Sequence, residues 1–298
     1  METTIHTHIS DLAPVIDAIR SAHETTPARY PQGICGFDGF VDNFIRFENP
    51  ASMAELGPKV TAAAGIAASF VVRHEGERFG GNGPLLAAAL HELHGGHITI
   101  DYIGGIGEPE PTPLFQNALG DKMTLHTLAE AAQTDCLEFT DGKLMLCDIG
   151  PCANIHWDRM VERMGLETID RLLGRADFIA AVNWGKLANV GSIWRELPRR
   201  LKELGKPAKA VPFFMDLAEF DARPLADREA LLELVAEITR QCTTMLSFNL
   251  KEAWQMAKTL GQDFSGQKTP EAVAAVTAYL REHTDVDRVI VHPNNGAA

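Results

Sequence analysis

FGGNGPLLAAALHELHGG, residues 79–96, joins a nearly bare loop to an apolar, alanine-rich helix pattern. Glycines at the start of this stretch let the backbone turn tightly and let another group approach it closely. The first N–H groups of a helix lack partners within the helix and attract polar or anionic groups. The stretch therefore predicts a loop that cradles a ligand or, alternatively, a plain connection with Gly83 as cap and Pro84 at the first helical position.

The composition of the chain favours an acidic cytoplasmic protein. Its 298 residues are 45% hydrophobic, enough for a sizeable core, and its formal net charge of -13 argues against a nucleic-acid or anionic-membrane partner. No apolar run approaches the roughly 18 residues of a membrane span. Five scattered cysteines, an odd number, are typical of free thiols in a reducing cytoplasm.

Short apolar runs alternate with longer helical patterns along most of the chain. The runs are residues 33–37, 98–103, 178–182, 211–215, 244–248 and 288–291, and the helical patterns are 84–94, 158–174, 190–204, 227–240, 250–260 and 270–283. This alternation predicts an α/β fold, with a doubly wound, mostly parallel sheet covered on both faces. We expect residues 1–298 to form one such domain.

Three segments interrupt the alternation and predict a small antiparallel sheet. Residues 135–148 form a hairpin pattern around Asp141-Gly142, which would place Phe139 opposite Leu144. Residues 69–79 suggest a second hairpin with its bend near Gly76, and residues 41–48 suggest a further strand. We interpret these segments as a lid whose apolar face is covered by ligand, by a partner subunit or by the main domain; decorative loops are the alternative.

Polar or bare residues follow almost every predicted strand. Asp38, Asn183, Asp216 and Asn249 each come directly after or at the end of an apolar run, and Gly104-Gly105 follows another. The carboxyl ends of parallel strands meet at one edge of a sheet, where ligands bind in α/β proteins. Each residue alone is also a favoured helix cap, but their repetition indicates a binding site.

Five motifs, in order, carry a resemblance to a known family. They are GICGFDGFVD, FGGNGPLLAAALHELHG, YIGGIGE, FFMDLAEFDAR and LSFNLKEAW. The chain resembles the ribokinase-like (PfkB) carbohydrate kinases over most of its length. The resemblance implies a large α/β domain with a small β lid, and phosphoryl transfer from ATP, with Mg²⁺, to a hydroxyl of a sugar or nucleoside.

The resemblance and the strand ends together define a candidate site. The expected substrate-binding residues are Asp38, Asp42, Gly80, Gly81, Asn82 and Asn183, and the expected cofactor-binding residues are Asp216, Asn249 and Glu252. Asn249 and Glu252 would act on Mg²⁺ through water. Two alternatives stay open: Asp42 as a charge on the lid surface, and Asn249 with Glu252 as a helix capping box.

Departures from the family pattern affect the substrate and the chemistry. Leu85 stands where many members carry a sugar-binding Asn, and Glu108 replaces the usual Asp. The family's Gly-Ala-Gly-Asp motif, which supplies the catalytic base, is absent, so the base is unassigned. We therefore expect residues beyond Ala298 to carry that base in the natural protein, and the chain as given to be inactive.

The sequence leaves two other function classes as alternatives. One is a sugar- or nucleotide-binding relative without phosphotransfer. The other is a dinucleotide-dependent oxidoreductase, which would need a G-x-G-x-x-G directly after a strand, and neither GGNGPL nor GGIGEP supplies it. A homodimer formed through the lid is a further expectation.

Overall fold

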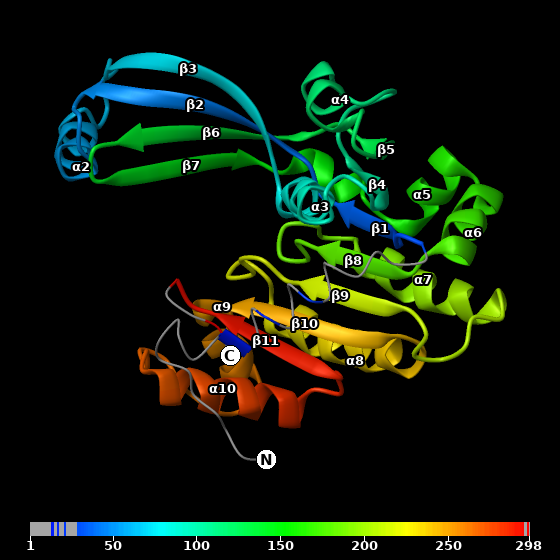
Figure 1. The fold of residues 1–298 in the computed structure, drawn as a ribbon. Coiled ribbons are helices and arrows are strands. Elements are labelled where there is room, and N and C mark those ends of the chain that lie inside the picture. Colours follow the sequence, from blue (N-terminus) through cyan, green and yellow to red (C-terminus); the bar gives the residue numbers. More distant parts are fainter. Residues whose placement is uncertain (1–12, 15–16, 18–20, 22–28, 295–296, 298) are drawn as a thin grey trace.

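The computed structural model describes residues 29–294, together with residues 13, 14, 17, 21 and 297. Two sheets organise these residues: a large one flanked by helices, and a small one that projects from it as an arm (Figure 1). Within the described part of the chain, no helix is both long enough and apolar enough to cross a bilayer.

The large sheet has seven parallel strands in the order β11-β10-β9-β8-β1-β4-β5. They are β1 (Gln32–Phe37), β4 (Thr99–Gly105), β5 (Thr124–Ala129), β8 (Phe178–Val182), β9 (Pro212–Asp216), β10 (Thr243–Asn249) and β11 (Arg288–His292). All six predicted apolar runs are confirmed as strands, and β5 is an additional one. The chain adds β4 and β5 on one side of β1 and then β8 to β11 on the other, so the strand order reverses between β1 and β8, a position where α/β sheets bind ligands.

Helices cover both faces of the large sheet, which explains why its strands are apolar on both sides. One face carries α5 (Trp157–Met164), α6 (Leu166–Arg175), α7 (Gly191–Glu203), α8 (Leu225–Gln241), α9 (Leu250–Thr259) and α10 (Pro270–His283). The other carries α3 (Asn82–Leu93) and α4 (Pro113–Leu119). Successive strand residues alternate between the faces: Ile34 packs in the first core and Cys35 in the second.

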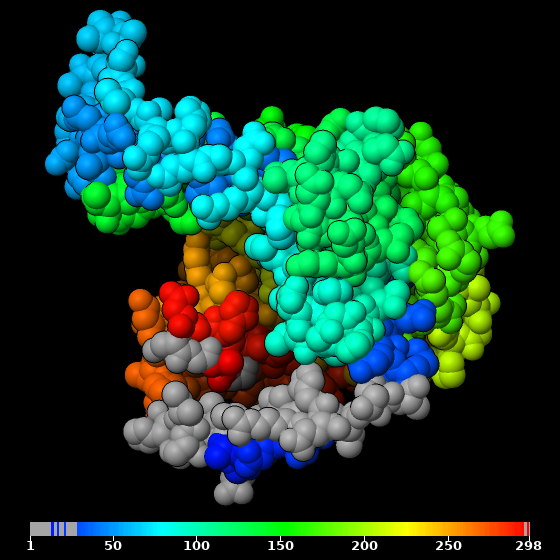
Figure 2. All heavy atoms as spheres, turned by 45° about the horizontal axis from the view of Figure 1, so that its top comes forward, coloured from blue at the N-terminus to red at the C-terminus, as the bar shows by residue number. Residues whose placement is uncertain are grey.

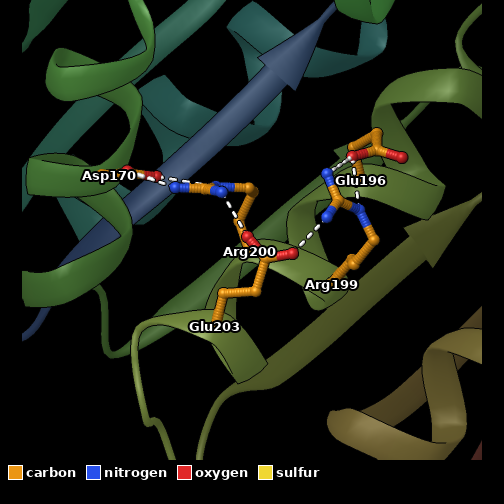
Figure 3. Close-up of polar contacts among 5 residues, drawn as sticks. All are labelled: Asp170, Glu196, Arg199, Arg200 and Glu203. Carbon is orange, nitrogen blue, oxygen red and sulfur yellow. Dashed lines mark hydrogen bonds and ion pairs between the residues drawn. The ribbon is translucent and has the colours of Figure 1, made fainter.

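The helix expected at 158–174 is divided into α5 and α6. Gly165 separates them with φ 75, a left-handed conformation that glycine adopts without strain. Arg200 of α7 then joins α6, since its Nε lies 2.9 Å from Asp170 Oδ1 (Figure 3). Arg200 also pairs with Glu203. These partly exposed pairs orient the helices, while the buried apolar face supplies most of the packing energy.

The arm consists of β3 (Val71–Gly80), β2 (Phe40–Asn49), β6 (Ala132–Phe139) and β7 (Gly142–Asp148), hydrogen-bonded in that order. Helix α2 (Met53–Ala62) lies at its tip (Figure 1). The three predicted segments thus lie in one small sheet. It is mixed rather than purely antiparallel, because the central pair β2 and β6 run parallel. The sequence pattern does not reveal this parallel pairing, because β2 and β6 are distant in the sequence and no hairpin joins them.

Two details of the arm differ from expectation. In the β6–β7 hairpin, Phe139 pairs with Gly142 and Leu137 with Leu144, so the turn residues are Thr140 and Asp141. The predicted pairing was therefore displaced by two residues, a shift that keeps the same side chains on the same face. Residues 71–80 form one continuous strand instead of a second hairpin, and the expected bend at Gly76 is a β-bulge with φ 98 opposite Phe44.

Candidate active site

A cleft of about 680 Å³ lies at the carboxyl ends of the central strands. It is visible in Figure 2 as the hollow beneath the projecting arm. Its polar lining includes groups from the arm, from the ends of β8, β9 and β10, and from the starts of α3 and α9: Asp42, Thr134, Asn82, Asn183, Asp216, Asn249 and Glu252. The convergence expected from the strand ends is therefore present, on the side of β1 where the strand order reverses.

Asp38 lies beneath the floor of this cleft. Its side chain is fully buried, and burial raises the pKa of its carboxyl, an effect that hydrogen bonds from Asn183, Gly83 and Asn82 oppose. The backbone N–H of Asn82 donates to Oδ2 at 2.8 Å, that of Gly83 to Oδ1 at 2.7 Å, and the Asn183 amide to Oδ2 at 2.5 Å. In this structure Asp38 orders the site from below, and its direct contact with substrate stays a prediction.

The bare loop before α3 is explained by two carboxylates of the protein itself. Gly81 has φ 102, and a Cβ there would lie 2.9 Å from Asp38 Oδ2. A Cβ at Gly80 would run into the carboxylate of Asp42. The N–H groups expected to be free for a ligand are thus occupied by Asp38. Gly81 lines the cleft, whereas Gly80 is buried and does not.

Asn183 and Asp216 form the centre of the cleft floor. Asn183 adopts φ 65, and its Oδ1 is buried without a hydrogen-bond partner among the described residues. Asp216 Oδ1 accepts from the N–H of Ala218 at 3.1 Å and lies 3.5 Å from the Asn82 amide nitrogen. Asp216 Oδ2 lies 3.8 Å from Nε2 of His292, and the Asp216 side chain is largely buried. The floor therefore holds one acceptor that has no partner in the described residues and one largely buried carboxylate.

The arm supplies the roof of the cleft. Asp42 is half-buried and faces inward beside Thr134 and Met145, instead of standing on the outer surface of the arm. Burial raises the pKa of Asp42, while a hydrogen bond from Thr134 and the charge of Lys143 act in the opposite direction. A carboxylate accepts strong hydrogen bonds from hydroxyl groups, so this placement suits a polyol.

Asn249 and Glu252 form a complete capping box at the start of α9. Asn249 Oδ1 accepts from the Glu252 N–H at 2.9 Å, and Glu252 Oε2 accepts from the Asn249 N–H at 2.9 Å. Glu252 is only 3% exposed, and burial raises its pKa to about 7. The helix capping box expected as the alternative is therefore present. Both residues also line the cleft, so the presence of the cap does not test whether they hold a metal ion through water.

The described residues hold no group of three or more His, Cys, Asp or Glu side chains arranged to bind a metal ion. Both oxygens of Glu252 already accept hydrogen bonds from Asn249. The donor set consequently fits a cation held through water better than one ligated directly by these side chains.

Several lining residues were not predicted. They are Phe40, Leu85, Leu86, Thr134, Met145, Val182, Lys186, Phe214, Ala218, Glu219, Ser247 and His292. His292 ends β11 as Asp216 ends β9, so the rule that identified Asp216 would also have found it. Thr134 and Met145 depend on the register of the arm, which the sequence pattern misplaced.

Comparison with known proteins places the chain among kinases. The family model for prokaryotic ketohexokinase matches residues 13–298. A ketohexokinase of Haloferax volcanii is 25% identical over 261 residues, covering 83% of this chain and 68% of that protein.

Solved structures resemble the fold at low identity. An ADP-dependent kinase in complex with fructose-6-phosphate and ADPβS has a TM-score of 0.64 and 12% identity, covering 96% of this chain and 72% of its own. Ribokinase from Cryptococcus neoformans var. grubii has a TM-score of 0.56 and 13% identity, covering 90% and 74%. The predicted ribokinase-like fold is confirmed.

Proposed function

This chain belongs to the prokaryotic ketohexokinase family and is a carbohydrate kinase, and on that premise we propose that it phosphorylates a ketohexose, with ATP as donor and Mg²⁺ as the accompanying cation. The observation that carries the acceptor assignment is the buried, unpartnered Oδ1 of Asn183 at the floor of the cleft. An unpaired buried acceptor is costly, and a sugar hydroxyl would satisfy it.

The acceptor half of the cleft is the part nearest β1 and the arm. Asp42 accepts from sugar hydroxyls above, while Asn82 and Asn183 bind them below. Met145 and Leu85 add apolar surface, which suits the C–H faces of a sugar ring. Asp38 keeps the floor in place through its three hydrogen bonds.

The donor half is the part nearest β9 and β10. There Asp216, Asn249 and Glu252 would hold Mg²⁺ through water molecules. The ion would neutralise charge on the phosphoryl oxygens. Asp42, Thr134 and Met145 of the arm line the acceptor half, and we propose that the arm acts as a lid that excludes water during transfer.

A relative that binds sugar without transfer is not favoured, since the family is one of kinases. The catalytic base stays unassigned. The 298 residues contain no Gly-Ala-Gly-Asp motif, and no described side chain takes over that role by its geometry alone.

A melting-temperature screen tests the proposed acceptor. Ketohexoses, aldohexoses, pentoses and nucleosides are each added with and without MgATP, because a ligand that binds the folded state raises the melting temperature. We expect a ketohexose to give the largest rise. Stabilisation by a nucleoside and by no ketohexose would overturn the acceptor assignment. Sugar-dependent ATP consumption then separates transfer from binding alone.

Two further proposals concern the cellular location and the oligomeric state of the protein. All five cysteines are free thiols, which supports a cytoplasmic location. The arm has open edge strands and exposes Val71 and Leu146, at 58% and 52%, which supports a homodimer formed through it. Light scattering at several protein concentrations tests the dimer, and a monomer throughout would exclude it.

A further inference from the structure

Lys186 occupies the boundary between the two halves of the cleft. It belongs to the turn after β8, and β8 lies between β1, which leads to Asp38, and β9, which ends at Asp216. Its side chain lines the cleft and is 31% exposed. A phosphoryl group passing from the donor half to the acceptor half must cross this boundary.

The charges of the cleft make this lysine unusual. Asp42, Asp216, Glu219 and Glu252 are acidic, and among the described lining residues no arginine and no lysine other than Lys186 opposes them. A polyphosphate would be repelled by such a lining unless a cation met it. Phosphoryl transfer depends on positive groups that stabilise the charge on the transferred group.

Lys186 can leave its present partner at little cost. Its Nζ lies 3.3 Å from Glu219 Oε2, in a pair with both side chains partly exposed. Glu219 has a second cation, since its Oε1 lies 3.5 Å from Lys251 Nζ. If Lys186 moved to a ligand, Glu219 would therefore keep a positive neighbour, and partly exposed pairs of this kind are individually weak.

The backbone that carries Lys186 is held rigidly. Arg223 donates from Nη2 to the carbonyl oxygens of Trp184 and Leu187, both at 2.7 Å, and lies 4.3 Å from the centre of the Trp184 ring. The N–H of Gly185 donates to the Leu217 carbonyl at 2.7 Å, which joins this turn to the one after β9. A fixed backbone with a long, mobile side chain is suited to delivering a charge to a set position.

We infer that Lys186 binds the terminal phosphates of the donor, exchanging Glu219 for the phosphate oxygens when a nucleoside polyphosphate enters the cleft. The inference deepens the proposed function and rests on it, since it takes the donor to be a nucleoside polyphosphate. Lys186 thereby counters the acidic lining at the point where the phosphoryl group crosses to the acceptor.

Calorimetric titration tests this role with two probes: inorganic tripolyphosphate, and the non-hydrolysable β,γ-imido analogue of ATP with Mg²⁺. Lys186→Met should weaken the binding of both by about tenfold to 100-fold, the usual worth of a charged hydrogen bond. Lys186→Arg should retain most of the affinity. Glu219→Gln should strengthen binding, because it releases Lys186 in advance.

Lys122→Met is the matched control, since Lys122 is 37% exposed and pairs with Glu92 away from the cleft. It should bind both probes as the wild type does. Equal affinity in Lys186→Met and wild type, or no binding of either probe by the wild type, overturns the inference. So does equal weakening by Lys186→Met and Glu219→Gln, which would make the pair a structural link.

The outcomes separate this inference from the proposed function. If a ketohexose raises the melting temperature but Lys186→Met binds both probes normally, the inference fails and the acceptor assignment stands. If probe binding depends on Lys186 while no ketohexose stabilises the protein, the acceptor assignment fails and the inference stands.

Discussion

Glu252→Gln should change how the stability of the protein depends on pH. Glu252 is 3% exposed, and burial raises its pKa from 4.5 to about 7. The folded state therefore favours the protonated carboxyl, whereas the unfolded chain ionises near the ordinary value. Glu252 therefore contributes most to the free energy of unfolding below pH 4.5. This contribution is lost as the pH rises from 4.5 through the folded-state pKa of about 7.

The size of the effect follows from the rise in pKa. A change from 4.5 to about 7 corresponds to about 3 kcal/mol over the full titration. Between about pH 6 and about pH 8.5, the wild type should lose about 1.4 kcal/mol through this group alone, whereas Glu252→Gln has no such loss. Gln can still accept from the Asn249 N–H, and any remaining loss in the cap is the same at both pH values.

Urea unfolding of both proteins at the two pH values gives the required double difference. Glu282→Gln, at an exposed position of α10, is the control and should show no pH-dependent difference from the wild type. A double difference near zero for Glu252→Gln would refute the reasoning, because it would mean that the buried carboxyl ionises as easily as one in water. If Mg²⁺ is held here, Glu252→Gln should also need more Mg²⁺ for activity or for nucleotide binding.

Three other outcomes are expected. In urea titrations, Gly81→Ala should lower the free energy of unfolding by about 1–3 kcal/mol. Gly261→Ala should lower it by less, because Gly261 has a similar φ of 100 but open space where a Cβ would lie. Equal losses would mean that the close approach of Gly81 to the buried carboxylate of Asp38 is unimportant. Asp42→Ala should weaken ketohexose binding about tenfold to 100-fold by calorimetry, whereas Asp135→Ala, on the opposite face of the arm, should not. If Asp42→Ala and the wild type bound ketohexose with equal affinity, Asp42 would be a surface charge and not a sugar ligand. Residues 1–298 should transfer phosphate to a ketohexose far more slowly than the usual kinase rate of about 1–100 per second, because the sequence lacks the motif that supplies the base and general-base help is worth roughly 10²–10⁴-fold; an ordinary rate would identify a described residue, Asp216 first, as the base.

The large sheet could be predicted from sequence because its signals are local. Each apolar run was long enough to form a strand buried on both faces, and the residue after it marked the edge where the cleft lies. Asn183 and Asp216 were found in this way. Residues 158–174 were predicted to form one helix, whereas the structure has two, α5 and α6. Gly165 can lie within a helix or end it, and only the packing of α5 and α6 determines which occurs.

The strand pairing of the arm and the contacts of the glycine loop before α3 could not be predicted in the same way. Pairing of β2 with β6 joins segments about ninety residues apart, and nothing in either segment specifies a parallel partner. The glycines at 80 and 81 indicated close approach, but the sequence did not show that the approaching groups are the carboxylates of Asp42 and Asp38. Lys186 was missed because a lysine in a turn is ordinarily a solvated surface residue.

The most direct test is a calorimetric titration of the purified protein with D-fructose, D-glucose and adenosine, in the presence of Mg²⁺ and the β,γ-imido analogue of ATP. If the cleft is the acceptor site of a ketohexokinase, fructose binds most tightly, and Asn183→Leu, which removes the unpartnered acceptor at its floor, weakens that binding at least tenfold. Tighter binding of adenosine or glucose than of fructose, or unchanged fructose affinity in Asn183→Leu, would contradict the account.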